Sequence, residues 1–149
     1  MPEATIAENA AYLTLAVNGV AAAFAGLRWW QVDPSPAVWP LLRAAQLVAG
    51  LQALVAIVLL VAGYEPSDDL YWLYALLPVA IGVIAEQLRI ASAEQVLEDR
   101  QLADAKAVGE LPESQQRSVV LAVVRREIGV MALAALVVAF LALRAALIV

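Results

Sequence analysis

Four long apolar runs limit what this chain can fold into. They cover residues 10–27, 44–62, 70–85 and 128–148. A helix needs about 20 apolar residues to cross the hydrocarbon core of a bilayer, which is about 30 Å thick. Hydrophobic residues make up 64% of the chain, against about 45–50% in soluble domains. The sequence therefore predicts an all-α, polytopic membrane protein with four transmembrane helices in an antiparallel bundle.

The segment between the third and fourth runs is predicted to be helical. Residues 92–125 are rich in Ala, Leu, Glu, Gln and Arg, which are good helix formers, and their one strong break is a turn near 109–111. The third helix is therefore expected to run from about 68 to 108 and the fourth from about 112 to 147, which extends both into a cytoplasmic helical hairpin. The chain is predicted to be one domain with spans at 8–30, 40–63, 69–91 and 126–148.

Apolar residues on the two arms of this hairpin are expected to form its seam. Ile90 and Leu97 on one arm are predicted to pack against Val120 and Val124 on the other. Residues 119–124 are apolar almost all round the helix, which is more than one seam requires.

The distribution of basic residues predicts the orientation of the chain in the membrane. Eight of the nine lie in the connection between the first and second runs or in the one between the third and fourth, namely Arg28, Arg43, Arg89, Arg100, Lys106, Arg117, Arg125 and Arg126. The N-terminal tail and residues 64–69 carry none. Basic residues near span ends prefer the cytoplasm. We therefore expect a multi-pass protein of the cell membrane with both termini outside and the hairpin in the cytoplasm.

The composition excludes several kinds of chemistry. The chain has no cysteine and no histidine, which excludes disulfides, thiol chemistry, Cys/His zinc sites and His-ligated haem. Its net charge of −5 and its lack of a basic stripe argue against a nucleic-acid partner. The predicted spans contain one deep glutamate and no serine. We therefore expect no catalytic residues, no metal, no cofactor and no enzymatic activity.

A layer of polar residues at the cytoplasmic ends of the spans is the candidate site. Ionisable groups within a membrane are costly, so each one is a functional hypothesis. The predicted layer centres on Glu86 and contains Glu86, Arg89, Arg43, Gln46, Arg126 and Glu127. Two interpretations stay open: a site for a polar ligand, an ion or a lipid headgroup, and a salt-bridge network that fixes the helix register.

Two further polar residues lie within the spans. Asn18 is near the middle of the first span and is expected to form a hydrogen bond to another helix. Gln52 lies on the face of the second helix opposite Arg43, so one of these two faces must meet a different neighbour.

No motif names an activity. The favoured hypothesis is a non-enzymatic membrane protein, either a homo-oligomer or an accessory subunit, that docks a partner through residues 119–124 and otherwise contacts membrane lipids. The alternative is a small ion or solute transporter or channel that uses Glu86 and the Arg/Gln layer.

Overall fold

A computed structural model describes residues 2–149 and contains five helices within them. Four are long: α1 (Pro2–Trp30), α2 (Val38–Val61), α3 (Leu70–Asp99) and α5 (Glu113–Leu147); α4 (Ala105–Gly109) is a short helix between α3 and α5. The four long helices are each long and apolar enough to cross a membrane. The expectation of an all-helical chain with four such helices is confirmed.

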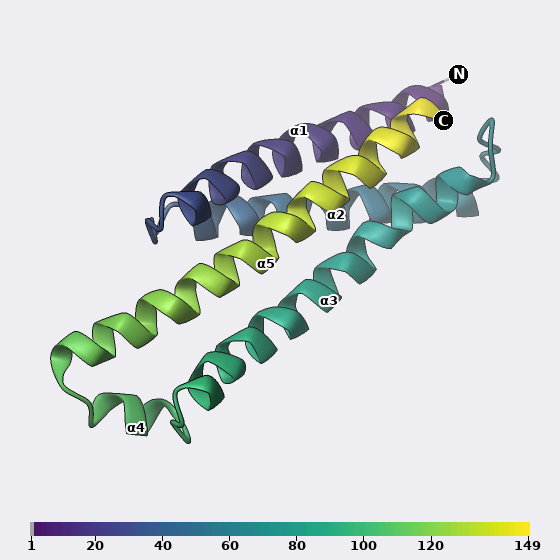
Figure 1. The fold of residues 1–149 in the computed structure, drawn as a ribbon. Helices are drawn as coiled ribbons and strands as arrows, with labels where there is room; N and C mark the ends of the chain where they lie inside the picture. Colours follow the sequence, from purple (N-terminus) through teal and green to yellow (C-terminus); the bar gives the residue numbers. More distant parts are fainter. Residues whose placement is uncertain (1) are drawn as a thin grey trace.

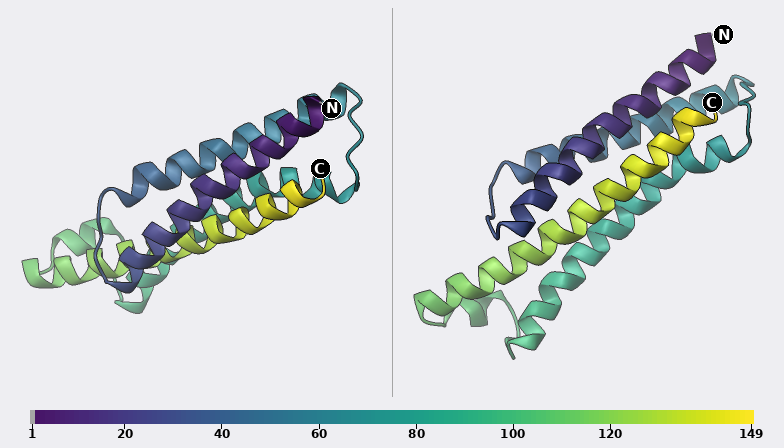
Figure 2. Two further views of the ribbon diagram at one scale, coloured as in Figure 1. Left: turned by 90° about the horizontal axis from the view of Figure 1, so that it is seen from above. Right: turned by 45° about the horizontal axis from the view of Figure 1, so that its top comes forward.

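The long helices pack side by side, and the two ends of the chain lie at the same end of the molecule (Figures 1 and 2). Helix α1 packs against α2 and α5, and α3 packs against α2 and α5. The distal parts of α3 and α5, with α4 between them, extend past the loop that joins α1 and α2. Each helix therefore has two principal neighbours, and its remaining face is open.

Small residues at a regular spacing form the contacts between these helices. The buried positions of α1 are Ala7, Ala11, Thr14, Asn18, Ala21 and Ala25, which alternate steps of four and three residues. The same alternation appears in α2, from Val38 through Leu42, Ala45 and Ala49. This 3.5-residue period is typical of left-handed helix packing, and alanine lets the backbones approach closely. Large side chains such as Leu47, Val61 and Phe140 are instead exposed.

Helices α1 and α2 end in the same hydrogen-bonded turn but with different residues at its critical position. Gly63 follows α2 with φ +83°, and Val32 follows α1 with φ +55°. In each turn, two backbone N–H groups bond back to carbonyls of the last helical turn: those of Val32 and Asp33 after α1. Glycine adopts this left-handed conformation freely, whereas a β-branched valine is strained in it. Val32 is therefore a strained position.

Val32→Gly is expected to raise the free energy of unfolding by roughly 0.5–1 kcal/mol, because the left-handed strain of about 1–2 kcal/mol outweighs the extra backbone entropy of glycine. Gly63→Val, the reverse exchange at the equivalent position, is expected to lower it. Thermal unfolding in one detergent checks both. A loss of stability in Val32→Gly would show that the valine side chain contributes more than its backbone strain costs.

Helix α3 ends earlier than the sequence predicted. The expected continuous helix to about residue 108 is wrong: α3 stops at Asp99, and α4 is a separate helix. Gln101 adopts φ +57°, and the N–H of Leu102 donates to the carbonyl of Leu97 at 2.8 Å. These are the features of a helix-ending turn of the kind usually made by glycine. The connection between α3 and α5 therefore covers residues 100–112 and includes α4. It is longer than the predicted turn near 109–111.

The seam between the distal parts of α3 and α5 also differs in its register. Val96 and Val119 are buried there, whereas Ile90 and Val120 are exposed. The prediction that Ile90 and Val120 lie in the seam is therefore wrong, whereas Leu97 and Val124 are partly buried. A rotation of one residue along a helix turns the side chain by about 100°, so neighbouring valines face opposite environments.

Candidate functional site

A cluster of hydrogen-bonded polar residues joins α2 to α3. The Oε1 atom of Glu86 on α3 accepts from the guanidinium of Arg43 and from Nε2 of Gln46, the latter at 2.9 Å, both on α2. Arg43 Nη1 also donates to Oε1 of Gln46 at 2.6 Å. The other Glu86 oxygen, Oε2, accepts from Arg89 Nε at 3.1 Å. Both carboxylate oxygens of Glu86 are therefore bonded.

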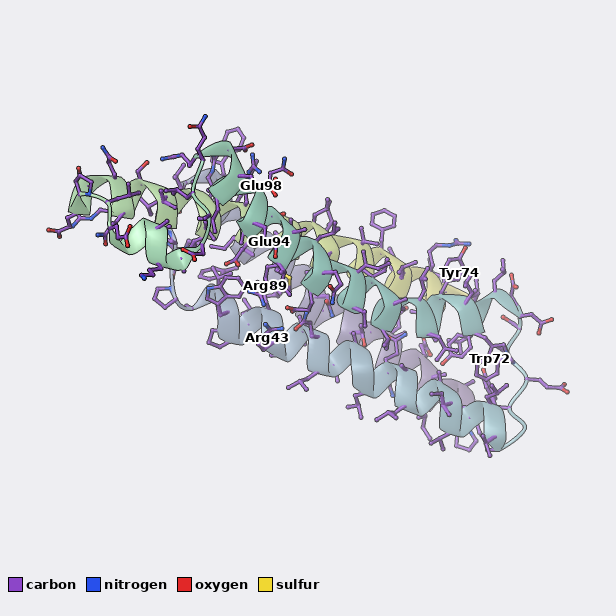
Figure 3. All side chains as sticks on the ribbon, turned by 90° about the horizontal axis from the view of Figure 1, so that it is seen from below. Arg43, Trp72, Tyr74, Arg89, Glu94 and Glu98 are labelled. Carbon is purple, nitrogen blue, oxygen red and sulfur yellow. The ribbon has the colours of Figure 1, made fainter. Side chains whose placement is uncertain are left out.

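Arg89 extends this cluster to α5. Its Nη1 lies 3.4 Å from Oε1 of Glu127, and its guanidinium lies 5.7 Å from the centre of the Trp39 ring. Arg43 and Arg89 lie close together on neighbouring helices in Figure 3. We call Arg43, Gln46, Glu86, Arg89 and Glu127 the polar cluster. It holds two cations and two anions, so its net charge is zero.

Arg126 is not part of the polar cluster. Its Nη2 lies 3.6 Å from Oδ2 of Asp99, further towards the end of α3. Glu127 faces Arg89, and a helix turns by about 100° per residue, so Arg126 points to a different place. Of the six predicted site residues, the structure brings five together and separates Arg126 from them.

A mostly apolar cavity of about 270 Å³ lies beside the polar cluster. It lies between α2 and α3, with α5 behind it, and its lining includes Gly50, Pro78, Gly82 and Val138. Gln46 and Glu86 line it at one end. This cavity was not predicted from the sequence, in which its best signal is the presence of Gly50 and Gly82 on facing helices.

Asn18 contributes a polar group to the same cavity. Its Nδ2 donates to the carbonyls of Thr14 and Ala45, each at 3.1 Å. The predicted hydrogen bond from Asn18 to another helix is confirmed, and its acceptor is on α2. Because both amide hydrogens are used, Asn18 can offer an occupant only its carbonyl oxygen.

Gln52 differs from Asn18, although it too is buried, with 1% of its surface exposed. Among residues 2–149, neither its Oε1 nor its Nε2 has a hydrogen-bond partner. It lies on the side of α2 that meets α1, near Asn9 and Leu13. The prediction that Arg43 and Gln52 face different neighbours is confirmed.

Aromatic residues from the connection after α2 and from the start of α3 gather at the opposite end from the polar cluster, as Trp72 and Tyr74 indicate in Figure 3. The rings of Tyr64, Tyr71 and Trp72 meet edge to face, with centres 5.1–6.4 Å apart. Burial raises the pKa of the Tyr64 hydroxyl above its usual value of 10.0, and the negative charge of Glu3 raises it further. The space between α2 and α3 is thus bounded by polar contacts at one end and by aromatic contacts at the other.

Apolar residues are exposed near the start of α5. Val120 is 53% exposed and Leu121 is 38% exposed. Leu121 and Arg125 border the same small hollow as Val32. The guanidinium of Arg125 lies 5.1 Å from the Trp29 ring centre, which ties the end of α1 to α5.

Comparison with protein-family models, with curated proteins and with solved structures finds no match to this chain.

Proposed function

We propose that the protein is a non-enzymatic, multi-pass membrane protein that docks a second copy of itself through its distal segment, residues 92–125. The observation that carries this proposal is the exposure of Val120 and Leu121 among charged residues. In this proposal the four long helices form an antiparallel bundle across the membrane, and the distal segment is a hairpin in the cytoplasm.

The orientation follows from the arginines. Arg28 and Arg43 flank the connection of α1 to α2, and Arg100, Arg117 and Arg125 lie on the distal segment or at its edge. The positive-inside tendency puts this end in the cytoplasm and both termini outside. Helix α5 has 35 residues, or about 52 Å, whereas a bilayer core takes about 30 Å. About 20 Å of α5 would therefore stand clear of the membrane.

In this proposal, the part of α5 that stands clear of the membrane includes Val120 and Leu121. Both precede Arg125 and Arg126 on α5, and Arg117 lies just before them. Exposed apolar side chains that lipid covers need no explanation, but a contiguous group of apolar side chains in water with a polar rim is typical of a contact surface. The exposed pair therefore supports docking of another protein.

The charges of the distal segment favour a second copy as the partner. Glu94 and Glu98 are exposed on α3 (Figure 3), and no ion pair involves either of them within residues 2–149. The arm on α5 carries Arg117, which also pairs with Glu113 at 3.5 Å, and Arg125, which also contacts Trp29. An acidic arm and a basic arm on one chain are complementary to the same arms of another copy. Such contacts are screened by salt, so the dimer should weaken as the ionic strength rises.

The alternative function, transport of an ion or solute through Glu86, has less support from the geometry. A carboxylate that binds a passing cation needs free acceptor positions and no fixed cation beside it. Both oxygens of Glu86 accept hydrogen bonds, from Arg43, Gln46 and Arg89. This arrangement is better suited to holding α2 and α3 in register.

Replacing both exposed apolar residues, Val120→Glu with Leu121→Glu, is expected to weaken self-association at least tenfold, because each charge would have to be desolvated at the contact. Light scattering and single-molecule photobleaching in nanodiscs measure the oligomeric state. The matched control is Ser114→Glu with Gln115→Glu, which adds the same charge at exposed polar positions of the same helix. A strictly monomeric wild-type protein at native lipid ratios would overturn the proposal.

A further inference from the structure

We propose that the cavity between α2 and α3 binds one phospholipid, with an acyl chain inside the cavity and the phosphate at Arg43. This inference rests on the membrane insertion of the four helices and not on docking by the distal segment. It is therefore tested by a different measurement from the one that tests self-association.

The walls of the cavity suit a hydrocarbon chain. Apart from Asn18, Gln46 and Glu86, all the residues that line it are apolar or glycine. Its volume of about 270 Å³ exceeds the roughly 150 Å³ of an apolar cavity that stays dry and binds benzene. Glu86 lies eight residues after Pro78 on α3, so the lining extends for about 12 Å along the helix, which fits within the depth of one leaflet, about 15 Å.

The two glycines of the cavity are not there for close packing. A Cβ atom added at Gly50 or at Gly82 would meet no other atom within 4 Å. The helices are therefore not in contact at these positions, and the missing side chains leave the space open. The polar cluster on one side and the Tyr64–Tyr71–Trp72 contacts on the other hold α2 and α3 together around it.

Beside Arg43, the polar cluster has free hydrogen-bond donors, whereas the nearest acceptors, on Gln46 and Glu86, already accept hydrogen bonds. Glu86 is bonded at both oxygens, and Gln46 uses both its amide groups in bonds to Arg43 and Glu86. Of the guanidinium nitrogens of Arg43, only Nη1 takes part in these bonds, and the side chain is 49% exposed. The Nε–H and Nη2–H groups are free to donate to phosphate oxygens. Arginine commonly binds phosphate in this way, with two parallel N–H groups that donate to two oxygens.

Native mass spectrometry of the purified full chain tests this site, with phosphatidylglycerol and a diacylglycerol of the same acyl chains as probes. We expect the wild type to retain one phosphatidylglycerol and to prefer it over diacylglycerol at least tenfold. Gly82→Leu should fill the cavity and lower retention of both probes at least tenfold. The matched control is Gly19→Leu on α1, where an added Cβ also meets no other atom within 4 Å and which lies outside this cavity; it should bind like the wild type.

The headgroup contact is tested by Arg43→Gln combined with Glu86→Gln, which removes a charge of each sign together. This double variant should keep the chain site but lose the preference for phosphatidylglycerol. Glycerol phosphate, which has no acyl chain, should not displace the bound lipid. If Gly82→Leu fails to fold, Gly50→Leu fills the same cavity from α2.

Equal retention by the wild type and a folded cavity-filling variant would overturn the proposal. Equal retention of diacylglycerol and phosphatidylglycerol by the wild type would overturn the role of Arg43. Displacement by glycerol phosphate would show an anion site without a chain site.

Discussion

Glu86→Gln is expected to lower the free energy of unfolding by about 2 kcal/mol, because hydrogen bonds to a charged group contribute about 1.5–3 kcal/mol each and partial exposure weakens them. The change leaves Arg43 and Arg89 without their shared anion. For a chain of this size, such a loss lowers the melting temperature by roughly 4–8 °C. Thermal unfolding in a mild detergent measures it.

Two controls separate the polar cluster from a general charge effect. Glu65→Gln removes an exposed glutamate in the connection between α2 and α3 and should change the melting temperature little. Arg43→Gln with Glu86→Gln should be less damaging than the sum of the two single changes, because the residues interact directly. Unchanged stability of Glu86→Gln together with lost ion flux in proteoliposomes would instead support the transport alternative.

Gln52→Met is expected to stabilise the protein by about 1–3 kcal/mol. Within residues 2–149 the buried amide of Gln52 has no hydrogen-bond partner, and an unsatisfied buried polar group costs that much. Methionine has nearly the same shape and no polar group to satisfy. The melting temperature in detergent should rise by several degrees.

The same exchange at Gln46 provides the matched control. Gln46 lies six residues earlier on α2 and donates to Glu86 at 2.9 Å, so Gln46→Met should destabilise the protein. If glutamine to methionine raises the melting temperature at position 52 and lowers it at position 46, the presence of a hydrogen-bond partner decides the effect of the substitution. A loss of stability in Gln52→Met would show that the Gln52 amide is hydrogen-bonded in the membrane-embedded protein.

The contacts of Glu86 with Arg43, Gln46 and Arg89 could be anticipated from local spacing and depth. Glu86 and Arg89 are three residues apart, which puts them on one face of any helix. Arg43 and Gln46 are similarly spaced, and their matching depth in the second span predicted that they would meet Glu86. The position of Arg126 could not be predicted in this way. Its direction depends on how α5 is rotated, and the burial of Ile128 and Met131 fixes that rotation.

The end of α3 is not marked in the sequence by a helix-breaking residue. Arg100 and Gln101 are good helix formers, and the segment holds no glycine or proline before Gly109. The left-handed turn at Gln101 is made by its tertiary setting, with Leu102 bonding back to Leu97. In contrast, Gly63 indicates the end of α2, because glycine commonly follows a helix in the left-handed conformation.

The buried faces of the long helices could not be predicted from hydrophobicity, because their apolar residues lie on every side. In a chain whose long helices are apolar on every side, hydrophobicity does not distinguish the inner face from the outer one. The size of the side chains does: the buried positions of α1 are mostly alanine, whereas its exposed positions include Leu13, Val20 and Leu27. Small residues at a 3.5-residue period were therefore the signal that could have identified the core.

Disulfide crosslinking of single-cysteine variants in native membranes tests the docking proposal most directly. The chain has no cysteine of its own, so Val120→Cys and Leu121→Cys each provide one thiol. With two differently tagged copies expressed together, oxidation should give a dimer that carries both tags at positions 120 and 121. Leu47→Cys, on the exposed face of α2, should stay monomeric. Monomers alone at 120 and 121, or equal crosslinking at Leu47, would contradict docking through residues 119–124.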